Sequence, residues 1–362
     1  MDRCVSAPGK LFLSGEYAVL WGGTALIAAV GPRLAGWVRA RDNLRIHLIS
    51  ATERLDGQAT PQGVHWTEPV PAGLLFAARG VDEALRARGA PGVGFDLVIA
   101  PASRAASGEK LGLGGSAQAA LISVELSRFA LQGTFDPLKV ALLAHSKAQA
   151  DSGSGGDVAA IYAGGLVRYR RYPVDSLASA SAQGQLASAL AGAPPVDVRR
   201  LAAPKLRLSF AYSGKSAGTL AQIQSVEARL SAAERERVKE ESDQLGRAVE
   251  EALVGDDFAS LLRAMESLQR LLSSLGPLET EAIRQIVAIA RSYGAAAKIS
   301  GAGGGDGCVM FSPDEDTERE LLAGLRSKKE CEAKRSWIRG YASLSRARRR
   351  GSRPSTANSC GR

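Results

Sequence analysis

Lys110-Leu-Gly-Leu-Gly-Gly-Ser-Ala-Gln-Ala-Ala120 is the stretch around which the chain is organised. Its glycines let the backbone approach a ligand closely, and from Ser116 onward alanine and leucine recur at helical spacing. A glycine-rich loop that leads into a helix binds phosphate, because free N–H groups and the positive end of the helix dipole face the ligand. Ser116 is then either the helix N-cap or a hydroxyl that contacts a metal ion between two phosphates.

This stretch lacks the signatures of two common nucleotide-binding loops. No Gly-Lys-Ser/Thr follows four variable residues after a glycine, so the stretch is not a P-loop. No acidic residue stands about 20 residues downstream at the end of a second strand, so it is not a dinucleotide fingerprint. The function of this loop therefore has to be inferred from other motifs in the chain.

Charge and composition restrict the classes of function. The 362 residues carry a formal net charge of +9, but residues 327–362 alone contain 11 Lys/Arg and two Glu, so the rest of the chain is neutral. We therefore expect no nucleic-acid partner for the folded body. No apolar run is long enough to span a membrane and no basic-then-apolar leader is present, which favours a cytoplasmic protein with no membrane partner. The four cysteines lack metal-ligand spacing and are expected to be reduced.

Strand-like and helix-like segments alternate in both halves of the chain, which predicts an α+β fold. A short strand over residues 4–10 is expected to end in a turn at Pro8-Gly9, and residues 34–41 and 44–50 are expected to form a β-hairpin. Helices are predicted over residues 71–88, 137–150, 232–253, 257–272, 279–293 and 317–325.

The domain organisation follows from composition. An N-terminal domain, 1–172, carries the phosphate loop, and an Ala/Ser/Gly/Gln-rich segment, 173–198, is predicted to link it to a C-terminal domain, 199–326. Residues 327–362 are expected to be a basic, partly disordered tail that is dispensable from about residue 345. Because this tail lacks clean alternation of apolar residues, we expect no closing strand for the C-terminal domain in it.

Three glycine-rich segments stand in order: Ala7-Pro-Gly-Lys10, Gly112–Ser116 and Ser300-Gly-Ala-Gly-Gly-Gly-Asp306. Together with Gly15-Glu16-Tyr17, they resemble the three motifs of the GHMP kinases, over about residues 3–326. The resemblance implies a two-lobe α+β fold with the active site in the cleft between the N-terminal and C-terminal halves. Either a monomer or a homodimer fits the sequence.

Within that family the chain looks most like the phosphomevalonate kinases, because of Gly153-Ser-Gly-Gly-Asp157, Ser213-Gly-Lys215 and Asp306. The resemblance implies ATP- and Mg²⁺-dependent phosphorylation of a phosphorylated mevalonate, a small-molecule substrate. Mevalonate kinase, or another family member acting on an alcohol, is the alternative. A phosphate acceptor needs cations that bring two anions together and no general base, because a phosphate monoester is already mostly dianionic at neutral pH.

The family's roles carry over where residues match. Lys10 and Asp157 are implied as catalytic, and Ser116 and Asp157 as Mg²⁺ ligands. The residues implied to hold the nucleotide phosphates are Lys110, Gly112, Leu113, Gly114, Gly115, Ser116 and Ala117. The residues implied to bind the acceptor are Lys10, Glu16, Tyr17, Ser154, Ser213, Lys215, Ala302, Gly303 and Asp306.

Each role has a purely structural alternative. Lys10 would be a solvated lysine after a turn, Asp157 a helix N-cap, and Asp306 a hydrogen-bond acceptor within its own loop. Ser213 and Lys215 would belong to a plain turn, and Glu16 and Tyr17 would shape the site without reacting. No chemistry is assigned to His145 or Lys147.

Two positions depart from the family pattern. Gly115 stands where the family usually has a serine, which removes one hydroxyl contact to phosphate but leaves Ser116 in place. Ser146 stands 11 residues before Asp157, where some mevalonate kinases have a metal-binding Glu. The metal would then rely on Ser116, Asp157, phosphates and water.

Overall fold

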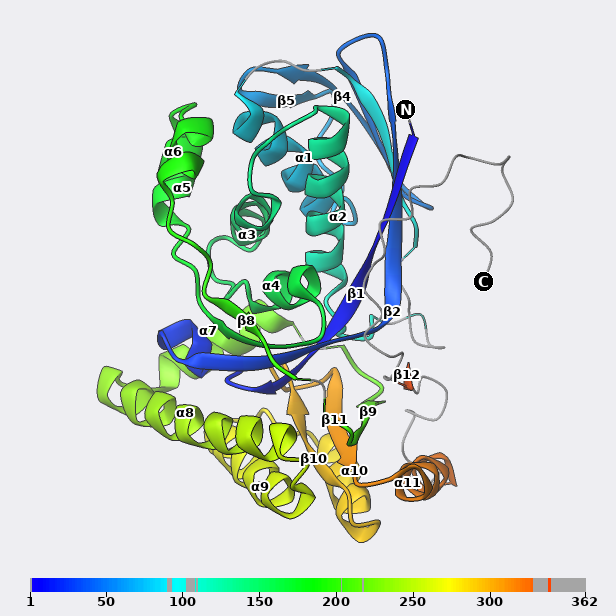
Figure 1. The fold of residues 1–362 in the computed structure, drawn as a ribbon, viewed down its shortest axis with the longest axis vertical. Helices are drawn as coiled ribbons and strands as arrows, with labels where there is room; N and C mark the ends of the chain where they lie inside the picture. Colours follow the sequence, from blue (N-terminus) through cyan, green and yellow to red (C-terminus); the bar gives the residue numbers. More distant parts are fainter. Residues whose placement is uncertain are drawn as a thin grey trace.

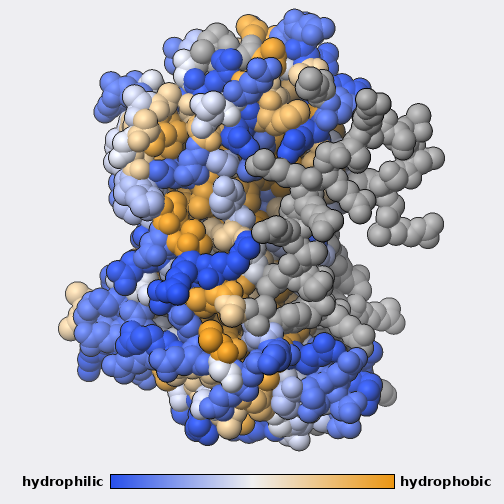
Figure 2. All heavy atoms as spheres, in the orientation of Figure 1, coloured by the Kyte–Doolittle hydropathy of each residue, from blue (hydrophilic) through white to orange (hydrophobic). Residues whose placement is uncertain are grey.

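The structure, a computed structural model, describes residues 2–89, 93–101, 108, 110–202, 204–216, 218–327 and 338–339. Two lobes lie one above the other, and each is a sheet with helices packed on it (Figure 1). The predicted α+β architecture is therefore confirmed. Figure 2 shows hydrophilic residues over most of both ends of the molecule, with hydrophobic residues gathered at the waist between them.

The N-lobe is built on an eight-stranded sheet with the order β5-β4-β3-β6-β2-β7-β8, in which β1 also pairs with β2. The long strand β2 pairs antiparallel with β7 through its first residues and with β6 through its last ones. The strands are β1 (Asp2–Ser14), β2 (Thr24–Ala40), β3 (Arg45–Ile49), β4 (Arg54–Thr60), β5 (Gly63–Trp66), β6 (Phe95–Ile99), β7 (Leu166–Arg170) and β8 (Val198–Arg200).

Helices cover one face of this sheet (Figure 1). They are α1 (Leu75–Arg88), α2 (Gly115–Ala130), α3 (Pro137–Ala148), α4 (Gly156–Ala163), α5 (Asp175–Ala182) and α6 (Leu186–Gly192), and a short 3-10 helix, η1 (Ala18–Trp21), follows β1. Leucines, valines and alanines at helical spacing face the sheet, so that Val81, Leu121 and Leu142, for example, join one buried cluster. This packing fixes where the N-terminal ends of α2 and α4 lie.

The C-lobe holds a four-stranded sheet in the order β10-β11-β9-β12. Its strands are β9 (Arg207–Tyr212), β10 (Ala296–Ser300), β11 (Gly307–Ser312) and β12 (Ile338–Arg339), and its helices are α7 (Thr219–Arg229), α8 (Ala232–Val254), α9 (Phe258–Ser274), α10 (Glu281–Ser292) and α11 (Glu315–Ser327). Helices 8 to 11 match the predicted ones within a few residues, whereas α7 was not predicted. No helix in the described ranges is both long and apolar enough to cross a membrane.

The two lobes share a hydrophobic core. Leu11 and Leu13 of β1 belong to the same buried cluster as Leu253 of α8 and Met265 and Leu268 of α9. Each of these side chains is almost completely buried, and burying a leucine contributes about 1.5–3 kcal/mol. The first strand of the chain is therefore part of both lobes.

Two predicted features of the sheet are wrong. Residues 34–41 and 44–50 do not form a hairpin, because β6 lies between β2 and β3 and pairs with both. Pro8-Gly9 does not end a strand: β1 continues through it, with a register shift between Ala7 and Gly9. A bulge accommodates a proline that cannot donate to the ladder, so the chain bends without turning back.

The predicted linker and the end of the predicted C-terminal domain both contain regular secondary structure. Residues 173–198 include α5 and α6, and Leu177, Leu186 and Leu190 are buried in the N-lobe core. The predicted loss of a closing strand is wrong in part, because β12 pairs antiparallel with β9 at the sheet edge. The predicted disorder from residue 345 onward lies outside the described residues.

Candidate active site

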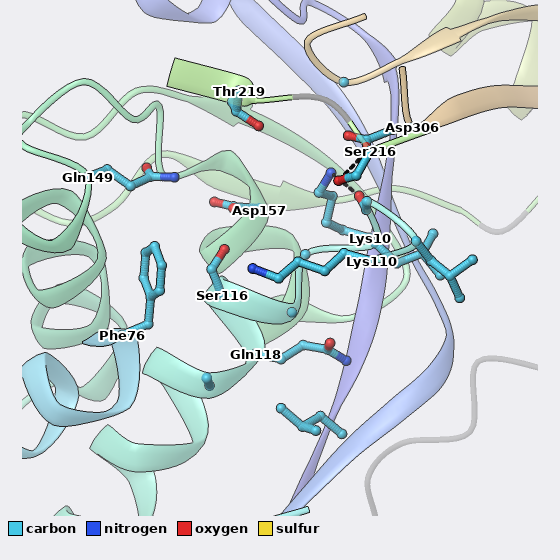
Figure 3. A pocket seen from close by; sticks show the side chains of 18 of the residues that line it. Lys10, Phe76, Lys110, Ser116, Gln118, Gln149, Asp157, Ser216, Thr219 and Asp306 are labelled. Atoms are coloured by element: carbon cyan, nitrogen blue, oxygen red, sulfur yellow. Dashed lines mark hydrogen bonds between the residues drawn. The ribbon is translucent and has the colours of Figure 1, made fainter. Parts of the chain in front are cut away.

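A cavity of about 540 Å³ opens between the lobes and is lined by residues of all three glycine-rich segments (Figure 3). Lys10, Lys110, Ser116, Asp157 and Asp306 point into the same space. The structure thus brings together residues that lie up to 296 positions apart in the sequence. We call the surfaces contributed by the two lobes the N-lobe wall and the C-lobe wall. The N-lobe wall consists of Lys10, residues 110–116, Gln118, Ala119 and Asp157, and the C-lobe wall of Ser216, Thr219, Ile223, Gly301, Ala302 and Asp306.

Lys10 belongs to a strand, not to the end of a turn. Its backbone N–H donates to Leu113 O at 2.9 Å, and its ammonium group donates to Gly112 O at 3.0 Å. The Nζ atom also lies 5.5 Å from the centre of the Phe12 ring, within the range of a cation–π contact. These contacts hold a positive charge against the glycine loop of the N-lobe wall, where phosphoryl oxygens would lie.

Ser116 is not the N-cap of α2. That position is Gly114, in the left-handed region at φ 88°, and no side chain caps the helix. The Ser116 hydroxyl is therefore not used by the helix, and it faces the cleft beside Phe76 in Figure 3. Free N–H groups in the first turn of α2 and this hydroxyl together fit the phosphates of a nucleotide.

Two glycines in the loop are required by close approach of other segments. A Cβ at Gly112, where φ is 71°, would lie 2.5 Å from Cγ of Asp306. A Cβ at Gly114 would lie 2.9 Å from Cγ of Lys10. Any side chain at these positions would push apart the three glycine-rich segments.

Asp157 lies in the first turn of α4, whose N-cap is Gly155. Its Oδ1 atom accepts a hydrogen bond from Val158 N at 2.9 Å, and its Oδ2 atom lies 3.5 Å from Nε2 of His145. The side chain is 17% exposed and lines the cleft. The N-cap alternative is therefore wrong, although Asp157 does bond to the backbone of its own helix.

Buried polar contacts join the two lobes next to the cleft. Glu16 and Lys298 form an ion pair in which both side chains are completely or almost completely buried. The Tyr17 hydroxyl donates to Ala302 O at 2.6 Å, and burial, together with the charge of Glu16, raises the pKa of this phenol. Tyr17 therefore stays a hydrogen-bond donor at any physiological pH, and it shapes the third glycine loop.

Asp306 is buried at a positive φ of 49°, and it organises the loop after β9. Its N–H donates to Lys215 O and its carbonyl accepts from Ser213 N, both at 2.7 Å. The Ser216 hydroxyl lies 3.5 Å from the Asp306 carboxylate. The carboxylate thus contacts the loop after β9, and it also lines the cleft.

Some residues with a predicted role lie outside the lining of the cleft. Among the described residues, Ser213, Lys215, Gly303 and Ala117 do not line it, whereas their neighbours Ser216 and Ala302 do. Other residues with a predicted role do line it, namely Leu113, Gly115, Ser154, Glu16 and Tyr17.

Four further residues line the cleft without belonging to a sequence motif: Phe76, Gln149, Ser216 and Thr219 (Figure 3). Their positions depend on how α1, α3 and α7 pack, and isolated polar or aromatic residues on helices carry no motif. His145 lies next to Ser116 and Asp157, which no local sequence pattern indicates because the three residues belong to different helices.

Comparison with known proteins gives three results. Residues 248–331 match the family model described as GHMP kinases C terminal. The chain is 30% identical over 353 residues to phosphomevalonate kinase of Streptomyces sp. (strain CL190), covering 87% of this chain and 91% of that protein. It is 28% identical over 341 residues to mevalonate kinase of Aeropyrum pernix, covering 90% and 93% of the two chains.

Among solved structures, Streptococcus pneumoniae phosphomevalonate kinase in complex with phosphomevalonate and AMPPNP superposes with a TM-score of 0.76. The match covers 89% of this chain and 95% of that chain at 23% identity, which shows a shared fold.

Proposed function

The chain belongs to the GHMP kinase family, and we propose that it transfers the γ-phosphoryl group of ATP to 5-phosphomevalonate, giving 5-diphosphomevalonate in the mevalonate pathway. An oxygen of the acceptor phosphate attacks the γ-phosphorus, the bond between that phosphorus and the β–γ bridging oxygen breaks, and ADP leaves with the electron pair. No proton has to be removed from a dianionic acceptor.

The residues of the N-lobe wall fit a nucleotide with Mg²⁺. The described residues contain no cluster of three His, Cys, Asp or Glu side chains that would hold a metal alone. Ser116 and Asp157 would supply two oxygen ligands, and phosphate oxygens and water the rest, which is the ligand set that Mg²⁺ prefers. When bound, Mg²⁺ neutralises charge on the β- and γ-phosphates.

The observation that carries the proposal is the position of Lys10. Its ammonium group donates a hydrogen bond to Gly112 O. A Cβ atom added to Gly301 would lie 4.0 Å from Lys10 Nζ. Lys10 therefore lies between the phosphate loop and the C-lobe wall, where two phosphates would meet. A cation fixed at this point favours the approach of two anions and stabilises the negative charge on the transferred group.

The surroundings of Asp157 fit an orienting role. One carboxylate oxygen accepts from Val158 N and the other faces His145. A carboxylate held in this way can direct Lys10 and the metal without accepting a proton. An alcohol acceptor, as in mevalonate kinase, is the second candidate. The 28% identity to the mevalonate kinase of Aeropyrum pernix supports this alternative.

The test is an ADP-release assay in which 5-phosphomevalonate, mevalonate, homoserine and galactose are offered side by side. We expect turnover of 5-phosphomevalonate alone. Turnover of mevalonate but not of 5-phosphomevalonate would contradict the proposal and support the second candidate.

Asp157→Asn sharpens the same test. A phosphate acceptor predicts a modest loss of kcat, because no base is removed. A fall to the background rate at an unchanged Mg²⁺ dependence would show that Asp157 takes a proton, and so would favour an alcohol acceptor.

A further inference from the structure

His145 is almost completely buried at the C-terminal end of α3, and one atom of its ring faces two residues of the N-lobe wall. Its Nε2 lies 3.3 Å from the Ser116 hydroxyl of α2 and 3.5 Å from Asp157 Oδ2 of α4. His145 is not among the described residues that line the cleft. It therefore contacts both side chains from behind, out of reach of a ligand.

The environment of the ring indicates which nitrogen carries the hydrogen. Nδ1 is buried and has no hydrogen-bond partner within the described residues, while the ring packs against Phe76 with 5.1 Å between centroids. Nε2, by contrast, has two oxygens in front of it. The tautomer that fits has its hydrogen on Nε2, so that the buried histidine presents one N–H donor to Ser116 and Asp157.

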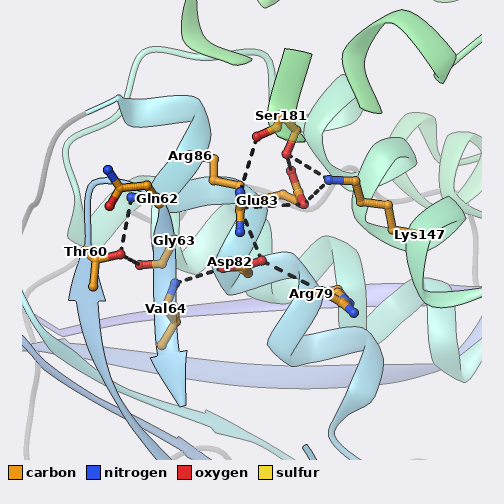
Figure 4. Close-up of polar contacts among 10 residues, drawn as sticks. All are labelled: Thr60, Gln62, Gly63, Val64, Arg79, Asp82, Glu83, Arg86, Lys147 and Ser181. Carbon is orange, nitrogen blue, oxygen red and sulfur yellow. Dashed lines mark hydrogen bonds and ion pairs between the residues drawn. The ribbon is translucent and has the colours of Figure 1, made fainter. Parts of the chain in front are cut away.

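A separate buried network fixes the rotation of α3 (Figure 4). Lys147 donates to Glu83 Oε1 at 2.7 Å and to the Ser181 hydroxyl at 2.8 Å, and Ser181 donates to Glu83 Oε2 at 2.6 Å. Residues two apart on a helix point about 200° away from one another. The contacts of Lys147 with α1 and α5 thus hold the side of α3 opposite to the one that carries His145.

We propose that His145 is a positioning residue for the metal site, which rests on the proposed use of Mg²⁺-nucleotide. Its Nε2–H fixes Ser116 Oγ and Asp157 Oδ2 in one arrangement and leaves the remaining lone pairs of both oxygens directed at the metal. Such partners behind metal ligands set ligand orientation, and their removal costs about 10- to 100-fold in metal affinity or activity. His145 itself neither binds the metal nor touches substrate.

Two substitutions of His145 distinguish the effect of its N–H donor from the effect of packing by the ring. The side-chain amide nitrogen of glutamine reaches the position of Nε2, whereas that of asparagine reaches only the position of Nδ1. The test is a calorimetric measurement of AMP-PNP binding to each variant over a series of Mg²⁺ concentrations. We expect His145→Asn to raise the Mg²⁺ concentration for half-maximal binding by about 10- to 100-fold, and His145→Gln to stay close to the wild-type protein.

The control is a second histidine that contacts a carboxylate. His47 Nδ1 lies 2.7 Å from Asp56 Oδ1, outside the lining of the cleft, so His47→Gln should leave Mg²⁺-dependent binding unchanged. Melting temperatures without metal or nucleotide report whether each variant is folded. A double variant, His145→Asn with Ser116→Ala, should lose less than the two single losses combined, because part of the effect of His145 acts through Ser116 and the rest through Asp157.

Three results would overturn the inference. Unchanged Mg²⁺ dependence in His145→Asn would show that the donor is not needed, and equal losses in the Asn and Gln variants would show that only packing matters. A strong preference for Mn²⁺ that disappears in His145→Gln would make His145 a direct ligand. Because binding needs no acceptor, a wild-type protein that binds Mg²⁺·AMP-PNP but phosphorylates neither mevalonate nor 5-phosphomevalonate would contradict the proposed function alone.

Discussion

The N-lobe wall of the cleft presents side chains from a strand and from helix ends, whereas the C-lobe wall is made mainly of loops. Ser116 and Asp157 lie in the first turns of α2 and α4, which are packed into the N-lobe core. Asp306 and Ser216 lie in loops held chiefly by backbone hydrogen bonds, such as that from Asp306 N to Lys215 O. On the proposed function, we expect the N-lobe wall to hold the transferred group and the C-lobe wall to contact the acceptor.

The largest effect is expected at the buried ion pair between Glu16 and Lys298, which joins the two lobes next to the walls. Lys298→Met leaves Glu16 buried without its partner, and we expect a loss of about 3–5 kcal/mol in the free energy of unfolding. Denaturant unfolding measures it. Lys298→Met with Glu16→Leu should recover most of the loss, and a single variant as stable as the wild-type protein would show that the pair does not hold the lobes together.

Lys10→Met tests the N-lobe wall directly. It removes a positive charge aimed at the transferring group, so we expect kcat to fall by about 10²- to 10³-fold with little change in melting temperature. Lys205→Met, at a lysine whose side chain is 89% exposed on the C-lobe, is the matched control. Near-normal kcat in Lys10→Met would remove this residue from the mechanism.

Ser116→Ala should affect the metal requirement more than the fold. One oxygen ligand is lost, but Ser116 is not the helix cap, so the stability cost should stay below the roughly 1 kcal/mol typical of a lost cap. Steady-state rates over a Mg²⁺ titration should show a higher half-saturating concentration. An unchanged Mg²⁺ dependence would exclude Ser116 as a ligand.

Thr219→Val tests the C-lobe wall, where the hydroxyl of Thr219 faces the cleft (Figure 3). Losing one hydrogen bond to the acceptor should raise its KM by roughly two- to tenfold, while kcat and the KM for ATP stay unchanged. A fall in kcat with constant KM would contradict the division between the two walls.

No effect is expected from deleting residues 345–362, which are assigned to neither wall. Turnover and melting temperature should equal those of the full chain. A clear loss of either would show that the basic tail contributes to the cleft or to stability.

Local patterns predicted the motifs and most of the helices, while tertiary neighbours could not be predicted. The glycine loop before α2 was identifiable because phosphate binding needs glycines and a helix start within one short stretch. The insertion of β6 between β2 and β3 was missed, because Asp42-Asn43 carries a turn signal whether or not the flanking strands pair. The role of His145 could not be predicted either, because its partners Ser116 and Asp157 lie 29 and 12 residues away on other helices.

The core shared by the lobes has a consequence for synthesis on the ribosome. The side chains that cover Leu11 and Leu13 of β1 include Leu253, Met265 and Leu268, more than 230 residues further along the chain. At 5–20 residues per second, the ribosome needs roughly 12 to 50 s to reach them. During that interval the apolar face of the first strand has no native partner from the C-lobe, so it is exposed to non-native contacts until α8 and α9 have been made.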